Sequence, residues 1–211
     1  MNKKLDTQVI IFLLMISLVI WGLGYWNYKS NKNHIPEWTA NSAIRFLSHA
    51  QQDLSKNELH ECTQNLERAV KIMKSIEHYS DDISNEYIEN SIHDLSTVIT
   101  EINEEHPSLD DLNVALFEAL NAVAYADLKI AEVDLEKGDL KKSLVLLKTS
   151  LFAVKRSARY MQPQDVILEQ KVILDMQSVI DSLEITLHIH PSELENLNKE
   201  IEEVLEREYL E

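Results

Sequence analysis

Histidines and carboxylates are the residues of this sequence that could bind a metal ion or transfer a proton. The chain contains 8 histidines and 36 acidic residues. The densest group of potential ligands is Glu58-Leu59-His60-Glu61-Cys62, but neighbouring residues of a helix project to different sides. His188 and His190 are two residues apart and are separated in the same way. A helical metal pair needs a spacing of four residues, or Glu-x-x-His segments on facing helices, so we expect no metal ion and no cofactor.

Nucleophilic chemistry has equally little support in the sequence. Cys62 is the single cysteine, and we expect it at a buried position because a reactive thiol needs a cationic neighbourhood. The sequence has no Gly-x-Ser-x-Gly, His-Glu-x-x-His or nucleotide-binding segment. Residues 26–211 contain one glycine, Gly138, whereas phosphate loops and tight β-hairpins depend on glycine. We therefore expect no catalytic residues and no enzymatic activity.

The charge of the chain is strongly acidic beyond its first segment. Of the 20 basic and 36 acidic residues, four basic and one acidic precede Glu37, which leaves 16 basic and 35 acidic residues, a net charge of −19. Such a surface repels phosphate backbones. We expect no nucleic-acid partner, and we expect the acidic residues mainly to keep the domain solvated.

The first element that the sequence predicts is a membrane anchor. No charged residue occurs among the 22 residues from Thr7 to Tyr28, a length that would cross a bilayer as a helix. We predict a short tail at 1–6, a transmembrane segment at 7–28 and a linker at 29–36, with the following domain outside the cytoplasm, at the inner membrane if the source is bacterial. A cleaved signal peptide and a buried core helix are the alternatives.

An internal repeat organises the rest of the chain. When the sequence is shifted by 81 residues, Ala50–Leu59 aligns with Ala131–Leu140 without a gap, and Leu66 aligns with Leu147. The same offset pairs Val98 with Val179. We predict two helical repeats, at 37–106 and 107–190, and a C-terminal helix within 191–211.

Each repeat is expected to contain three helices. The apolar spacing predicts first helices at 38–55 and 109–136, second helices at 58–79 and 139–160, and third helices at 83–104 and 164–188. A final helix is predicted at 192–210. Gly138 suits a left-handed helix end, and Asn57 occupies the same slot in the first repeat. The predicted fold class is therefore all-α, a duplicated three-helix unit behind a transmembrane helix and followed by a C-terminal helix.

The hairpin around Gly138 resembles a tetratricopeptide hairpin. The resemblance rests on Ala131, Gly138-Asp139-Leu140 and Leu147, although the closing proline is missing and the period is 81 rather than about 34 residues. The plan of two Ala-x-x-x-Leu-x-x-Gly-like hairpins in an exported chain also resembles the YfdX family. That resemblance implies a bacterial envelope protein linked to acid and drug stress, without an established enzymatic activity.

These observations predict a binding role rather than a catalytic one. We expect a membrane-anchored structural or adaptor module that presents helical grooves to a protein partner at the cell envelope. The groove expected to bind the partner is flanked by Leu47 and Leu66 in one repeat and by Leu128 and Leu147 in the other. The alternative is a sensor for a small ligand or for pH, with its site between the two repeats.

Overall fold

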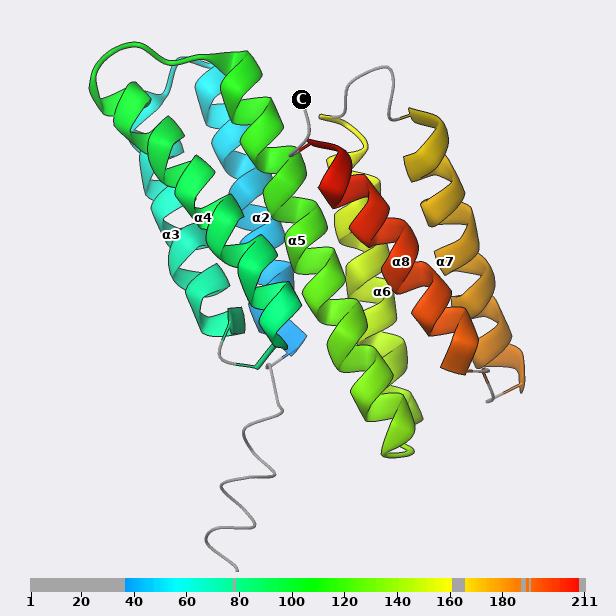
Figure 1. Cartoon of the computed structure of the whole chain (residues 1–211). Coiled ribbons are helices and arrows are strands. Elements are labelled where there is room, and N and C mark those ends of the chain that lie inside the picture. Colours follow the sequence, from blue (N-terminus) through cyan, green and yellow to red (C-terminus); the bar gives the residue numbers. More distant parts are fainter. Residues whose placement is uncertain (1–36, 78, 161–165, 187–188, 190, 209–211) are drawn as a thin grey trace, which may run out of the picture. The chain divides into compact units, whose positions relative to one another are not determined.

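The described part of the chain folds into seven α-helices, and it contains no strand (Figure 1). The computed structural model describes residues 37–77, 79–160, 166–186, 189 and 191–208. The helices are α2 (Glu37–Ser55), α3 (Leu59–Glu77), α4 (Asp82–Asn103), α5 (Leu109–Glu136), α6 (Leu140–Ser157), α7 (Val166–Thr186) and α8 (Pro191–Glu208). The prediction of an all-α helical bundle is confirmed.

The transmembrane part of the predicted fold class requires correction. Among the described helices, none is both long enough and apolar enough to cross a bilayer. Even the 28-residue α5 carries Glu118, Asp127 and Lys129 in its middle. The fold of the described residues is therefore a seven-helix bundle without a spanning helix. The span predicted at 7–28 lies outside the described residues.

The two helical hairpins end their first helices with the same turn. Asn57 has φ +61° and Gly138 has φ +79°, and these residues are 81 positions apart. The amide of Glu58 donates to the carbonyl of Asp53 at 2.8 Å, and the amide of Asp139 donates to the carbonyl of Asp134 at 2.8 Å. The left-handed conformation that the turn requires is tolerated best by glycine and next by asparagine, so the same geometry forms twice.

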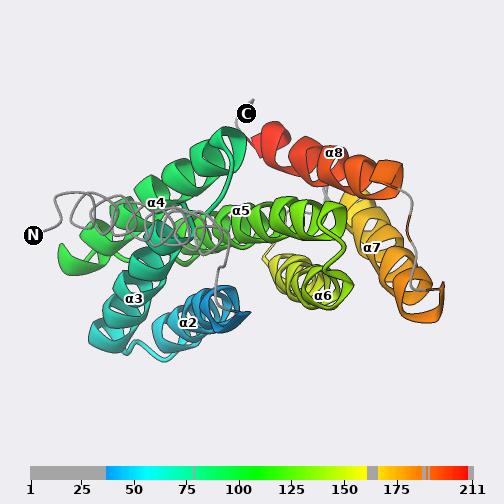
Figure 2. The same ribbon diagram turned by 90° about the horizontal axis from the view of Figure 1, so that it is seen from below.

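Helix α5 is the centre of the bundle. Each helix packs against the next one along the chain, and α5 also contacts α2, α3 and α8. Figure 2 shows α5 between α4 and α8 on one side and α2 and α6 on the other. Most residues between Leu112 and Ala131 are buried as a result. Tyr125 of α5 meets Tyr87 of α4 edge-to-face, with ring centroids 5.3 Å apart.

The contacts between helices also repeat along the chain. In the first half, α5 packs against α2 and α4, and in the second half α8 packs against α5 and α7. Helix α5 thus packs against the first and third helices of the first repeat, and α8 packs against the first and third helices of the second repeat. Helix α8 therefore occupies the position that the first helix of a further repeat would take. We call residues 81 positions apart equivalent residues below.

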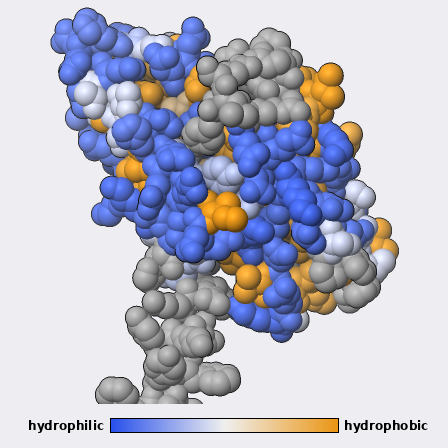
Figure 3. Space-filling model, viewed as in Figure 1, coloured by the Kyte–Doolittle hydropathy of each residue, from blue (hydrophilic) through white to orange (hydrophobic). Residues whose placement is uncertain are grey.

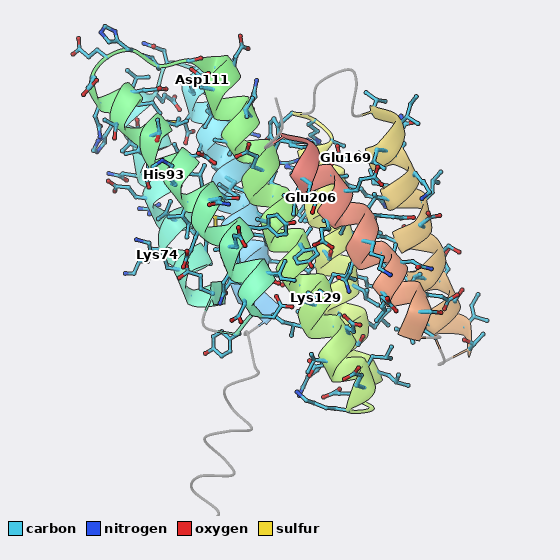
Figure 4. All side chains as sticks on the ribbon, in the orientation of Figure 1. Lys74, His93, Asp111, Lys129, Glu169 and Glu206 are labelled. Carbon is cyan, nitrogen blue, oxygen red and sulfur yellow. The ribbon has the colours of Figure 1, made fainter. Side chains whose placement is uncertain are left out.

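A polar trio joins three helices of the second half. The hydroxyl oxygen of Ser157 on α6 lies within hydrogen-bond distance of the side-chain oxygen of Asn121 on α5, at 3.0 Å, and of the carboxyl group of Glu169 on α7. All three residues are buried, and Figure 4 marks Glu169 on α7 beside α6 and α8. The equivalent residues in the first half are apolar and buried, namely Ala40, Ile76 and Ile88. The second half therefore holds a hydrogen-bonded group where the first half holds hydrocarbon.

Ser157→Ala should lower the free energy of unfolding by about 1–3 kcal/mol, because it leaves buried polar groups of Asn121 and Glu169 without the hydroxyl partner. Urea denaturation followed by circular dichroism measures the change. Ser75→Ala is the control, because that hydroxyl is exposed and bonds only its own helix. The triple variant Asn121→Ala, Ser157→Ile and Glu169→Ile copies the apolar trio and should retain or raise stability. A loss in the triple variant as large as in Ser157→Ala would contradict this account.

Asp127 is an ionisable group in the interior of the bundle. Its side chain on α5 is 0 % exposed, and neither carboxyl oxygen has a hydrogen-bond partner among the described residues. Its neighbours one turn away, Val123, Ala124, Ile130 and Ala131, are buried and apolar. Burial disfavours the charged form and holds the pKa of Asp127 well above its ordinary value.

Asp127 should make the protein less stable as pH rises. In the unfolded chain the carboxyl group ionises near pH 4, whereas burial in the folded protein keeps it protonated to higher pH. The free energy of unfolding is therefore highest below about pH 4 and falls as pH rises toward the raised pKa of Asp127 in the folded protein. Asp127→Asn cannot ionise and should be more stable than the wild type at pH 8, with a difference that shrinks toward pH 3.5. Asp110→Asn, an exposed change in the same helix, should change the pH profile little. A difference between Asp127→Asn and wild type that is independent of pH would refute the prediction.

Candidate protein-interaction surface

The four leucines predicted to flank a partner groove lie in the interior. Leu47, Leu66, Leu128 and Leu147 are each fully buried in the hydrophobic core. Leu47 and Leu66 belong to the α2–α3 hairpin, and Leu128 and Leu147 belong to the α5–α6 hairpin. Their spacing follows the packing of two helices against each other, so these side chains stabilise the hairpins and offer no surface in this conformation.

The other chemistry-bearing residues are dispersed. Within the described ranges, no three His, Cys, Asp or Glu side chains are placed to share a metal ion. His49, His60, His93 and His106 are exposed, and the remaining histidines lie outside the described residues. The thiol of Cys62 is buried, and burial together with the nearby Asp53 raises its pKa to about 11. Cys62 is therefore a packing residue, as expected from its sequence context.

A line of exposed aliphatic side chains runs along α7. Ile167, Leu174 and Ile185 are 83 %, 69 % and 82 % exposed, more than any other large hydrophobic residue of the described part. Their separations of 7 and 11 residues place them on one line of a helix with 100° per residue. We call these three residues the α7 stripe. Figure 3 shows hydrophobic side chains along the edge where Figure 1 places α7, beside a mostly hydrophilic surface.

A shallow groove follows the lower half of the α7 stripe. It has a volume of about 410 Å³ and is open to solvent. All of its lining residues belong to α7, namely Leu174, Gln177, Ser178, Asp181, Ser182, Ile185 and Thr186. An open groove on a single helix differs from the enclosed, polar-anchored pocket that a small molecule usually occupies.

The equivalent helix of the first half provides an internal comparison. The same side of the helix faces the interior in α4 and in α7. The equivalent buried pairs are Ile88 and Glu169, Leu95 and Met176, Val98 and Val179, and Ile102 and Leu183. At the positions equivalent to the α7 stripe, however, the first half carries Glu86 and His93 on α4 and Glu104 at the C-cap of α4, all exposed. His93 is labelled on α4 in Figure 4. The fold therefore accepts polar residues at these positions, and packing within the chain does not explain the aliphatic residues of α7.

The α7 stripe lies between two helices of opposite charge. Helix α6 contains five basic residues and no acidic one, and α8 contains seven acidic and two basic residues. Lys148 of α6 forms an ion pair with Glu184 of α7, and Lys155 of α6 hydrogen-bonds Gln177 of α7 at 3.1 Å. On the other side, Lys171 of α7 pairs with Glu200 of α8. The lysines of α6 thus stand beside the exposed α7 carboxylates Asp181 and Glu184 on one border, whereas the border formed by α8 is mainly acidic.

The sequence did contain a signal for the α7 stripe that hydrophobic periodicity does not reveal. Helix α7 has apolar residues on both its inner and outer sides, so periodicity alone predicts a buried helix. Comparison of equivalent residues separates the two sides, because the inner apolar positions are shared with α4 whereas Ile167, Leu174 and Ile185 replace polar residues. Comparison of the chain with known proteins found no matching family model, no similar curated protein and no similar solved structure.

Replacement of the α7 stripe by its first-half equivalents should leave the fold intact. The triple variant Ile167→Glu, Leu174→His and Ile185→Glu changes only exposed side chains, so its free energy of unfolding should lie within about 1 kcal/mol of the wild type. Thermal unfolding followed by circular dichroism measures this. Met176→Glu on the buried side of α7 should instead be strongly destabilising. A comparable loss in the triple variant would show that the stripe contributes to packing within the chain.

Proposed function

We propose that this protein is a non-catalytic helical module that acts by binding another protein chain through the outer face of α7. The observation that supports this proposal is the pattern of equivalent residues, aliphatic on α7 and polar on α4. An exposed Ile or Leu gains about 1.5–3 kcal/mol when it is buried against a partner. Three of them on one line of a helix supply an apolar centre, and the charged residues of α6 and α8 supply a polar rim, as in specific protein interfaces.

A protein partner is favoured over the alternatives by the shape and charge of this surface. The groove on α7 is open and shallow, which suits a protein surface better than a small ligand. A nucleic-acid partner is disfavoured because the chain carries a formal net charge of −16. The proposed role is that of a structural or adaptor module. Its contact surface is the outer face of α7 and differs from the predicted groove flanked by the four buried leucines.

Site-specific photo-crosslinking tests the proposal. A photoreactive amino acid is placed at Leu174 of the full chain, expressed in its source cells, and the crosslinked proteins are resolved by electrophoresis and identified by mass spectrometry. We expect a discrete crosslinked species from position 174, and the same species from positions 167 and 185. The matched control is His93, the equivalent position on α4, which should give no such species.

Two outcomes would contradict the proposal. One is the absence of any discrete crosslinked species from all three positions of the α7 stripe in well-expressed protein. The other is an identical pattern from positions 93 and 174, since that result would show that the aliphatic residues confer no preference. Crosslinking that disappears when the two other residues of the stripe are replaced by glutamate would strengthen the assignment.

A further inference from the structure

We propose that the partner of the α7 stripe is a second copy of this chain, and that the two α7 helices lie parallel to each other around a twofold axis that runs along them. This inference rests on the proposed function, because it names the occupant of the same surface. Two features of the described residues support it: the line of aliphatic side chains and the opposite charges of the helices that border it.

The apolar stripe matches itself. In a twofold pair each residue has the same surroundings in both copies, so the surface must be self-complementary. With parallel α7 helices, Ile167, Leu174 and Ile185 each lie opposite their own counterparts at the same height. Every aliphatic side chain of the stripe therefore meets another aliphatic side chain, and all three pairs leave water together.

The charges beside the stripe decide the direction of the pair. A rotation about an axis along α7 exchanges the two borders, so the basic α6 of one copy faces the acidic α8 of the other on both sides. An axis perpendicular to α7 would give antiparallel helices and would bring α8 against α8 and α6 against α6. Because like charges repel and each chain already carries a net charge of −16, the parallel arrangement is favoured.

Specific residues carry this complementarity. Lys148 and Lys155 are seven residues apart on α6, and both contact α7, so they supply the cations of the border on the α6 side. Lys148 pairs there with Glu184 of the same chain, and this pairing lowers the net positive charge of that border. Glu193 lies seven residues before Glu200 on α8, on the same side of the helix. Glu203 follows Glu200, the partner of Lys171, by three residues on α8 and is exposed. The exposed Glu193 and Glu203 therefore form the acidic border.

The length of α7 sets the extent of the contact. Helix α7 has 21 residues, about 30 Å at 1.5 Å per residue, and the stripe runs along most of it. Helices α6 and α8 pack against α5 as well as against α7, so they lie behind the stripe and α7 itself forms the centre of the contact.

Cysteine crosslinking of the full 211-residue chain tests the arrangement. Ile167→Cys, Leu174→Cys and Ile185→Cys are made singly and treated with a short bismaleimide. The native Cys62 is buried and its pKa is raised to about 11, so it should not react. Parallel helices place each new thiol beside its own counterpart, so all three variants should form covalent dimers. Glu86→Cys and His93→Cys on α4, and Glu104→Cys at its C-cap, lie at the equivalent positions and should stay monomeric.

Light scattering on the wild type and on charge-reversal variants provides the second readout. The untreated wild type should show a mass near twice 24.4 kDa at micromolar concentration. Lys148→Glu with Lys155→Glu, and separately Glu193→Lys with Glu203→Lys, should each weaken the dimer at least tenfold. A mixture of the two variants should restore association, because both borders of the mixed pair again carry opposite charges. Misfolding of either variant could not produce that recovery.

Each result decides between the proposals. Crosslinking that requires a mixture of the 167 and 185 variants would show antiparallel helices and overturn the proposed direction. A wild type that stays monomeric at 100 μM would overturn the dimer. The proposed function would survive that result if the photoreactive group at position 174 traps a different protein. It would fail as well if position 174 traps nothing.

Discussion

Burial of α5 on nearly its whole circumference is the constraint on which the rest of the bundle depends. A helix that is apolar on all sides cannot remain in water, so other helices must surround it. Five helices do so, α2, α3, α4, α6 and α8. Short turns bring its sequence neighbours α4 and α6 alongside it, and the remaining contacts come from more distant parts of the chain. Helix α7 is the described helix outside this shell that packs only on α6 and α8, which leaves its outer face open.

The two halves share a backbone plan, and two of the places where their chemistry differs involve α7. In the interior, the trio of Asn121, Ser157 and Glu169 replaces alanine and isoleucine. On the surface, the α7 stripe replaces charged and polar residues. Both changes occur in the second half, and both involve α7. A buried hydrogen-bonded group fixes the orientation of a helix more specifically than hydrocarbon does, so the trio holds in place the helix that presents the exposed stripe.

Much of this fold follows from local sequence signals. The predicted helices agree with the observed ones to within a few residues, because Gly138, Asn57 and the cap at Ser108 determine where helices begin and end. The candidate site was not predictable in the same way. Leu47, Leu66, Leu128 and Leu147 recur at matched spacing because the hairpins need them as core, and recurrence cannot distinguish a core position from a binding position. Exposure of α7 depends on which helices pack against it, which a local pattern does not specify.

Helix α8 stands where a third unit would begin, and its solvent-facing residues are polar. Its exposed positions include Glu195, Lys199, Glu203 and Glu206. The corresponding side of α5 is covered by its hairpin partner α6. In stacked-repeat proteins, a polar outer face keeps the exposed end of a stack soluble. The outer side of α8 therefore presents charged groups to solvent, where α5 presents buried apolar groups to its hairpin partner α6.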